Sequence, residues 1–442
     1  MKSFLAIFFC ALLLPLAALA QTAQTAATPS TSAPAPTRLT LADAEAVALK
    51  NNPLVTVAKL RSLISHEQVR EVRSALLPDL SLNVTGVEAR PDSRVAASGL
   101  NNPIIFPRAA AGATLSQLIT DFGRTTNLIS SSQYQAKAEE ENAVATRAQI
   151  LLAVDHAFYE TLETQALVQV AQQTVEARQV LVDQVSALTN AKLKSDLDLS
   201  FVNVDASRSK LQLLEAENNH ETSLADLSAL LGYSDSQNFD LVQDGSAELQ
   251  IPAQEVVPLI QAALKQRPEV NALQFEVLAE EKLSHAEHDL WRPTISALGV
   301  VGEAPVRDDH IPNWYGAAGV NINIPVFNGF RFNARAKASD LETEASRQKL
   351  IEARNDIARD VRIAWQDERR AYERLSLTRQ LRDQANLALE LAQARYKLGL
   401  SSIVEYTQAE LQKTEADITD TDAVYQFRQT QRALDYATGA LR

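Results

Sequence analysis

The chain carries an internal duplication whose landmarks keep their spacing. Pro53 and Pro78 are separated by the same number of residues as Pro268 and Pro293. Further along each copy, Arg124 and Gly232 have the same separation as Arg331 and Gly439. Rods that pack side by side cannot change length independently, so this spacing indicates two copies of one elongated unit.

Residues 1–20 are typical of a secretory signal peptide. Lys2 supplies the positive charge, Phe4 to Leu16 form the apolar stretch, and Ala18-Leu19-Ala20 is a small-residue cleavage site. A retained membrane anchor is the alternative. Cys10, the only cysteine, lies inside the apolar stretch, so cleavage would leave a mature chain without thiols or disulfides.

Composition and charge narrow the class of protein further. Residues 21–38 are rich in Pro, Ala, Thr and Ser, which predicts a disordered linker. The formal net charge of −13 speaks against nucleic acid as a partner. Only 13 glycines occur in 442 residues, which favours long helices. After the signal segment no stretch approaches the ~18 apolar residues of a transmembrane helix.

Two segments without proline or glycine predict very long helices, from Arg124 to about Thr189 and from Arg331 to Leu398. At ~1.5 Å per residue each spans on the order of 100 Å. The helices that return from them, about Leu197–Leu231 and Ser402–Thr438, are half as long. We expect the helix of ~25 residues before the second proline of each copy to stack end to end with them and complete a rod.

The second long helix shows a heptad pattern that predicts coiled-coil packing. Its small and apolar positions are Ile357, Val361, Ala364, Ala371, Leu375, Ala385, Leu389, Ala392 and Tyr396. Alanine at many of these positions lets neighbouring helices approach closely. Glu368, Thr378 and Arg382 interrupt the pattern.

Alternating polarity predicts two strands in each copy. Leu80, Leu82 and Val84 alternate with polar residues, so that strand has one apolar and one polar face. The four expected strands are Asp79–Ala89, Ala109–Thr120, Thr294–Ala304 and Trp314–Val326. An open sheet edge in a bilayer leaves backbone groups unpaired, and closure takes ~8 strands or more, so several chains would have to share one barrel. A soluble four-stranded sheet covered by helices is the alternative.

Four sets of residues, each present in both copies, carry a resemblance to a known family. They are the strand entries Leu77-Pro78 and Arg292-Pro293; the strand exits Asp121-Phe122-Gly123-Arg124 and Phe327-Asn328-Gly329-Phe330-Arg331; the turns Ala191 to Asp198 and Arg395 to Ser402; and the ends Leu230-Leu231-Gly232 and Ala437-Thr438-Gly439. In this order and spacing the chain resembles the TolC-like outer-membrane efflux proteins over Leu39–Gly439.

The resemblance implies a mainly α-helical, internally duplicated chain with transmembrane β-strands. Three chains would share a 12-stranded barrel, with four strands from each, continued by a long α-helical periplasmic barrel. The implied organisation is a signal peptide (1–20), a linker (21–38), a first repeat (39–232), an equatorial linker (233–253) and a second repeat (254–439). The loops Pro91–Pro107 and Pro305–Asn313 would then face outside.

It also implies the role of an exit duct in the outer membrane, extending into the periplasm and exporting small molecules or proteins. The implied partners are two further copies of the chain, outer-membrane lipid, a periplasmic adaptor (membrane fusion) protein, and an inner-membrane pump of RND, ABC or MFS type. The alternative from another class is a periplasmic adaptor or scaffold built on coiled-coil hairpins, with no pore.

The sequence offers little to an enzyme. We find no phosphate loop, no Gly-x-Ser-x-Gly and no Cys/His metal cluster. Glu281, His285 and His288 have a spacing that could bind a metal on a helix, but a solvated helix face is the favoured interpretation. We therefore predict no enzymatic activity, no cofactor and no metal.

The expected gate lies where the heptads stop, at the turn after each long helix. Glu405 and Asp198 hold equivalent positions in the two copies, and three copies would place a ring of carboxylates near the narrowest aperture. A carboxylate stabilised by the helix dipole is the alternative. Gln408 shares the face of Glu405 and is neutral. We further expect a hydrogen bond between Tyr396 and Asp198 that latches the helices shut.

The two turns themselves are the expected adaptor-docking tip. Gly399, Leu400 and Ser401 form the second turn, and glycine there permits close backbone approach. In the first turn Lys192 and Leu193 stand at the equivalent positions. The resemblance implies glycine where this chain has Lys192, so the two turns differ in what they offer an adaptor.

Overall fold

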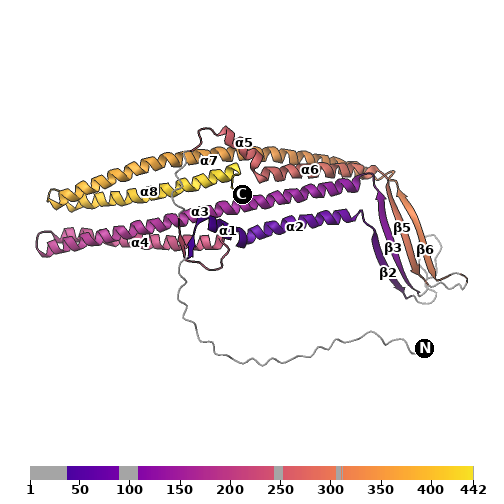
Figure 1. Cartoon of the computed structure of the whole chain (residues 1–442), viewed down its shortest axis with the longest axis horizontal. Coiled ribbons are helices and arrows are strands. Elements are labelled where there is room, and N and C mark those ends of the chain that lie inside the picture. The colour runs from indigo at the N-terminus through magenta and orange to yellow at the C-terminus, as the bar shows by residue number, and fades with distance from the viewer. Residues whose placement is uncertain (1–36, 89–107, 243–251, 305–309, 311, 442) are drawn as a thin grey trace, which may run out of the picture.

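A computed structural model describes residues 37–88, 108–242, 252–304, 310 and 312–441. Two helices of 67 residues, α3 (Arg124–Asn190) and α7 (Arg331–Lys397), run along its length. A sheet lies at one end, and the two turns that connect consecutive helices lie at the other (Figure 1). The predicted signal peptide, most of the 21–38 linker and the loop Pro91–Pro107 lie outside the described residues.

The remaining elements confirm the duplicated plan. The first copy holds β1 (Thr37–Leu39), α1 (Leu41–Asn51), α2 (Pro53–Ser74), β2 (Asp79–Val87), β3 (Arg108–Thr120) and α4 (Asp196–Leu230). After β4 (Phe239–Leu241) the second copy holds α5 (Val257–Gln266), α6 (Pro268–His288), η1 (Asp289–Trp291), β5 (Thr294–Glu303), β6 (Trp314–Asn323) and α8 (Ile403–Thr438). Along α3 lie α4 and then α2, and along α7 lie α8 and then α6, as the stacked-rod prediction required (Figure 1).

The sheet is antiparallel, in the order β2-β3-β5-β6, so the two copies meet between β3 and β5. β2 and β6 are its edges. The alternating residues Leu80, Leu82 and Val84 on β2 are 70–75% exposed, which leaves an apolar face bare in the single chain. β6 ends at Asn323 rather than at the predicted Val326, because Pro325 has no N–H to extend a ladder.

Each passage from strand to long helix uses two consecutive left-handed residues. They are Phe122 and Gly123 before α3, with φ of 56° and 111°, and Gly329 and Phe330 before α7, both with φ of 64°. Glycine thus occupies the second left-handed position in the first copy and the first position in the other. Bulky residues rarely adopt this conformation, so the surrounding structure must impose the sharp turn.

At the middle of the rods, α1, α2 and α4 are joined by hydrogen bonds and by a short strand pairing. Thr40 and Asp43 form a capping box at the start of α1. Asn52 Nδ2 donates to the carbonyl of Leu230 at 2.9 Å, which ties the end of α4 to the α1–α2 bend. A parallel pairing of β1 with β4 completes this region. Both short strands fall largely within the predicted linkers. Leu39 and Leu241 are nevertheless buried there.

Small and apolar residues fill the coiled coils, and polar groups bridge the interruptions. Ile357, Val361 and Leu375 of α7 are at most 5% exposed, as the heptad pattern predicted. The interrupting Thr378 and Arg382 both bond to Asp420 of α8, which is itself buried. Polar residues at core positions therefore fix the register of α7 against α8.

The residues with metal-like spacing on α6 pair elsewhere. Glu281 accepts from Arg347 at 2.8 Å, and His288 lies 3.1 Å from Asp340. Over the described ranges no three His, Cys, Asp or Glu side chains are arranged to hold a metal ion. Likewise, none of the helices in the described ranges has an apolar stretch long enough to cross a membrane.

Candidate functional site

The two turns at the tip have the same backbone geometry. In the first, the N–H of Leu193 donates to Leu188 O at 2.8 Å and that of Lys192 to Thr189 O at 2.9 Å. In the second, Leu400 donates to Arg395 O at 2.8 Å and Gly399 to Tyr396 O at 3.0 Å. Both are Schellman caps, which need a left-handed residue directly after the C-cap. Lys192 and Gly399 supply it, with φ of 58° and 73°.

The side chains at these turns face outward. Leu193 and Leu400 are 71% and 67% exposed, and Lys192 is exposed as well. Ser401 is half-buried, and its hydroxyl oxygen is enclosed without a hydrogen-bond partner. Each turn thus presents one exposed apolar side chain, Leu193 on the first and Leu400 on the second.

The two predicted gate carboxylates behave differently. Ser195 caps the start of α4 and accepts from the N–H of Asp198 at 3.1 Å, while Asp198 Oδ2 accepts from the N–H of Ser195 at 3.3 Å. Ser402 caps α8 and accepts from the N–H of Glu405 in the same way. The longer Glu405 side chain, however, lies 3.3 Å from Arg395 Nε of α7. One carboxylate caps its own helix, and the other forms an exposed ion pair across the turn.

The expected hydrogen bond between Tyr396 and Asp198 is absent from this chain. The Tyr396 hydroxyl is enclosed without a hydrogen-bond partner. Its ring stacks on Tyr406, with centroids 5.5 Å apart and an interplanar angle of 9°, and Lys194 Nζ lies 4.6 Å from the ring centre. Ring stacking and the cation–π contact hold the Tyr396 ring, and Asp198 takes part in the capping box of α4. The gate role of the predicted residues stays a prediction.

A cavity of about 360 Å³ separates the two turns. Tyr396, Tyr406 and Lys194 line it, together with Leu193 and Gly399. Burial raises the pKa of the Tyr406 phenol, so that group stays neutral.

Beneath this cavity a buried ion pair joins the two hairpins. Arg178 Nη1 of α3 lies 2.5 Å from Glu410 Oε2 of α8 and 3.8 Å from Asp205 Oδ2 of α4. The Arg178 and Glu410 side chains are only 7% and 9% exposed. Burial raises the pKa of Glu410 against the lowering effect of Arg178. Removing Arg178 would leave the buried Glu410 carboxyl group without its cation.

Residue spacing alone does not identify this pair, although a signal is present in α3. Arg178 precedes Leu181 and Val185 at helical spacing, so a charge stands in line with buried apolar positions. Such a residue in a heptad row needs a partner from the facing helix. The heptad positions of α3 alone do not show which helix faces Arg178. Gln408, in contrast, is exposed and lines a small cavity beside Arg178.

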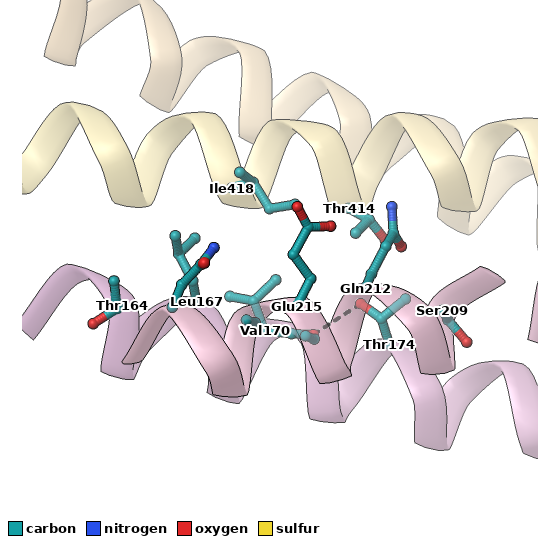
Figure 2. A pocket seen from close by; sticks show the side chains of 12 residues that line it. Thr164, Leu167, Val170, Thr174, Ser209, Gln212, Glu215, Thr414 and Ile418 are labelled. Carbon is teal, nitrogen blue, oxygen red and sulfur yellow. Dashed lines mark hydrogen bonds between the residues drawn. The ribbon is translucent and has the colours of Figure 1, made fainter. Parts of the chain in front are cut away.

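A groove continues from this pair along α3, between α4 and α8 (Figure 2). Its cavity measures about 290 Å³. Leu167 and Val170 form an apolar floor, Ile418 closes one side, and Glu215 points from α4 toward α8. This surface could receive an apolar segment that presents a cation to Glu215.

Comparisons with known proteins agree with the geometry. The model of the family described as "Outer membrane efflux protein" matches residues 46–233 and 259–440. The chain is 22% identical over 395 residues to the outer membrane protein TolC of Escherichia coli, covering 85% of this chain and 77% of TolC. It is 24% identical over 380 residues to the outer membrane protein OprJ of Pseudomonas aeruginosa, covering 82% and 76%.

Among solved structures, the outer membrane protein VceC of Vibrio cholerae superposes with a TM-score of 0.75 at 18% identity, covering 90% of this chain and 96% of VceC. The likeness therefore extends over nearly the whole fold, both sheet and rods. The matched family is one of outer-membrane efflux proteins, so the alternative of a pore-free periplasmic scaffold is set aside.

Proposed function

Because the chain belongs to the outer membrane efflux protein family, we propose that it acts as a trimeric exit duct through which a tripartite efflux or secretion system exports its cargo. The relatives that it resembles are outer membrane proteins. The chain itself is an outer-membrane efflux protein. The number of copies, the partners and the gate belong to the proposal.

The observation that carries the proposal is a four-stranded sheet with two open edges, attached to rods of about 100 Å. Unpaired backbone groups at the β2 and β6 edges cannot remain bare in a bilayer. Pairing β6 of one copy with β2 of the next satisfies both edges at once. Three copies would then close a 12-stranded barrel, which is within the size range of outer-membrane barrels.

Apolar seams on the rods support the same assembly. The exposed seam on α4 consists of Leu197, Phe201, Val204, Leu211 and Leu214, and that on α7 of Leu377, Leu381, Leu391 and Leu398. Their helical and heptad spacings align each set along one helix face. Since α4 and α7 lie in different hairpins, the α4 seam of one copy can cover the α7 seam of the next. Such a head-to-tail contact closes into a ring when the rotation between successive copies completes a full turn.

The tip supports the proposal that a periplasmic adaptor docks there, with an inner-membrane pump of RND, ABC or MFS type behind it. Leu193 and Leu400 are exposed apolar side chains, and each directly follows a residue with a positive φ. A partner backbone can come close to these tight turns. The groove with Leu167, Val170 and Glu215 extends the available surface toward the sheet. An adaptor that engages both would touch each hairpin and could part them.

The proposed gate lies at the same end. Three copies would bring three Glu405–Arg395 pairs around one axis, with Asp198, Tyr396 and Gln408 nearby in the chain's fold. Opening would require separation of the α3/α4 and α7/α8 hairpins, which the Arg178–Glu410 pair opposes. The gate and the docking points are therefore mechanically connected through α8.

Cysteine cross-linking across the two sheet edges tests the trimer. The variant Leu82→Cys/Ala318→Cys places one thiol on β2 and one on β6, and the expected mature chain has no other thiol. A short bifunctional thiol reagent applied to outer membranes should give cross-linked dimers and trimers and no larger species. Each single variant is the matched control and should stay monomeric on denaturing gels.

Conductance of the purified protein in planar bilayers then tests the duct. A protein that cross-links into trimers and forms a pore fits the proposal. Cross-linking that continues beyond trimers would contradict ring closure, and trimers without conductance under any gating condition would contradict a pore.

A further inference from the structure

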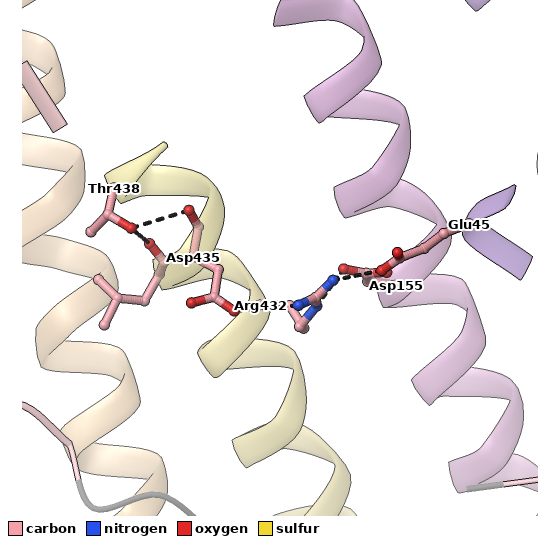
Figure 3. A network of polar contacts seen from close by, with 6 residues as sticks. Glu45, Asp155, Arg432, Asp435 and Thr438 are labelled. Atoms are coloured by element: carbon pink, nitrogen blue, oxygen red, sulfur yellow. Dashed lines mark hydrogen bonds and ion pairs between the residues drawn. The ribbon is translucent and has the colours of Figure 1, made fainter. Parts of the chain in front are cut away.

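A cluster of acidic residues from α1, α3 and α8 surrounds one guanidinium group (Figure 3). Arg432 of α8 is its centre. The guanidinium lies 2.5 Å from Asp155 Oδ2 of α3, 2.6 Å from Glu45 Oε1 of α1 and 3.4 Å from Asp435 Oδ2 of α8. The Asp155 side chain is fully buried, and those of Arg432 and Glu45 are about a quarter exposed.

A fourth carboxyl group faces the cluster from α7. Glu368 is 6% exposed, its Oε2 has no hydrogen-bond partner, and its main charged neighbour is Asp435. Asp155 likewise keeps one buried oxygen, Oδ1, without a partner. Three carboxyl groups, from α1, α3 and α8, thus surround one guanidinium, and a fourth from α7 lies beside Asp435.

Full ionisation of this arrangement is costly because Asp155 and Glu368 are buried, although the Asp435 side chain is 46% exposed. With every carboxyl ionised, Arg432 neutralises only one of the three negative charges around it, and Glu368 adds a fourth beside Asp435. Uncompensated charge in a water-poor interior is costly, and the usual remedy is to bind protons. The two buried oxygens without partners, on Asp155 and Glu368, are where a proton would fit.

We propose that the Arg432 cluster is a proton-dependent clamp, which holds the C-terminal end of α8 against α1, α3 and α7 when it is protonated and loosens when it is fully ionised. No established property of the duct requires it. The clamp lies at the base of the α7/α8 hairpin, so its state would set how freely that hairpin pivots.

Other groups around the cluster do not cancel the excess charge. Tyr159 of α3 is neutral, since burial raises its pKa. Arg428 of α8 is a second cation and acts on Tyr159. Even with Arg428 counted, four carboxyl groups face two guanidinium groups. At the same level Arg267 is paired with Glu269 at 2.8 Å and so contributes no net charge.

The direction of the pH effect follows from burial. Desolvation raises the pKa of Asp155 from 3.8 to about 7, with Arg432 opposing, and raises that of Glu368 from 4.5 to about 7, with Asp435 adding to the effect. The packed form therefore holds protons that the opened form releases between these values. Local stability is greatest at the acidic end of that interval and is lost as pH rises through about 7.

Hydrogen exchange of the purified full chain tests the clamp without any transport assay. We compare protection factors, corrected for intrinsic exchange, over residues 427–438 of α8 at pH 5.5, 7 and 8. Protection should fall with rising pH by up to roughly tenfold per pH unit for each proton released. Asp155→Asn and Glu368→Gln should each shrink this slope, and the double variant should abolish it.

Asp383→Asn is the matched control, because that carboxylate on α7 is 70% exposed and lies outside the cluster. It should keep the parent slope. If Asp155→Asn fails to assemble, Glu368→Gln carries the test. Protection in the parent that does not change with pH, or a full slope in the double variant, would overturn the proposal. Either result would leave the duct itself untouched, since exchange does not depend on conductance.

Discussion

Lys192 and Gly399 hold equivalent positions in the two copies and share one backbone conformation. Both lie directly after the C-cap of a long helix, with φ of 58° and 73°, and both donate to a carbonyl of the last helical turn, at 2.9 Å and 3.0 Å. Glycine adopts this conformation freely, whereas lysine does not. The first turn of the tip is therefore strained where the second is relaxed.

Replacing Lys192 by glycine should stabilise the first turn. Relief of the left-handed strain, less the added freedom of the unfolded chain, should raise the free energy of unfolding by about 0.5–1 kcal/mol. Thermal unfolding of the purified chain measures it. Leu193→Gly, at the neighbouring position without a positive φ, is the control and should destabilise. A loss of stability in Lys192→Gly would show that the lysine side chain matters more than its backbone.

The buried and exposed ion pairs of the tip should respond very differently to one substitution. Arg178→Met leaves Glu410 buried without a partner and should cost about 3–5 kcal/mol. Arg395→Met removes a pair whose side chains are 57% and 47% exposed, and should cost at most about 1 kcal/mol. Similar losses of thermal stability in both variants would contradict this ranking.

Substitution of two glycines with a positive φ distinguishes the cost of backbone strain from the cost of a steric clash. A Cβ on Gly232 would lie 2.9 Å from Asn51 O, whereas one on Gly399 meets nothing within 4 Å. Gly399→Ala should therefore cost about 1 kcal/mol, and Gly232→Ala about 1–3 kcal/mol more. Chemical denaturation of both variants would measure the difference. Equal losses would mean that the α1–α2 bend yields to the added methyl group.

Tip docking can be tested at the second turn. Leu400→Asp places a charge on an apolar side chain that is 67% exposed, and Gly399→Pro forbids its positive φ. Both should abolish export while trimers still assemble on gels. Leu193→Asp makes the same change on the first turn and shows whether both turns dock. Normal export by Leu400→Asp and Gly399→Pro would rule out docking at this turn.

The charge at the proposed aperture should set ion selectivity. Glu405→Ala should weaken cation preference, while Arg395→Gln, which frees the Glu405 carboxylate from its partner, should strengthen it. Reversal potentials in planar bilayers under a salt gradient measure both. Asp383→Asn, on an exposed part of α7, is the control. Unchanged selectivity in Glu405→Ala would make that residue only a helix-start charge.

The sequence alone was sufficient for the duplicated plan, the lengths of the helices and the positions of the four strands. These follow from local rules. Proline at 53, 78, 268 and 293 limits helices wherever it stands, and alternation such as Leu80, Leu82, Val84 marks a strand with two unlike faces. The strand end at Asn323 could have been read from Pro325 by the same rule.

Only the tertiary structure decided which side chains pair between different helices. Arg432 meets Asp155 and Arg178 meets Glu410, each across the two copies, because antiparallel packing of α3 on α8 brings these positions level. Tyr396 packs on the ring of Tyr406 rather than bonding to the carboxylate of Asp198, which takes part in the cap of α4. Local periodicity specifies which side of a helix is buried, but the identity of the facing residue depends on the register between helices, and that register is set by the whole interface at once.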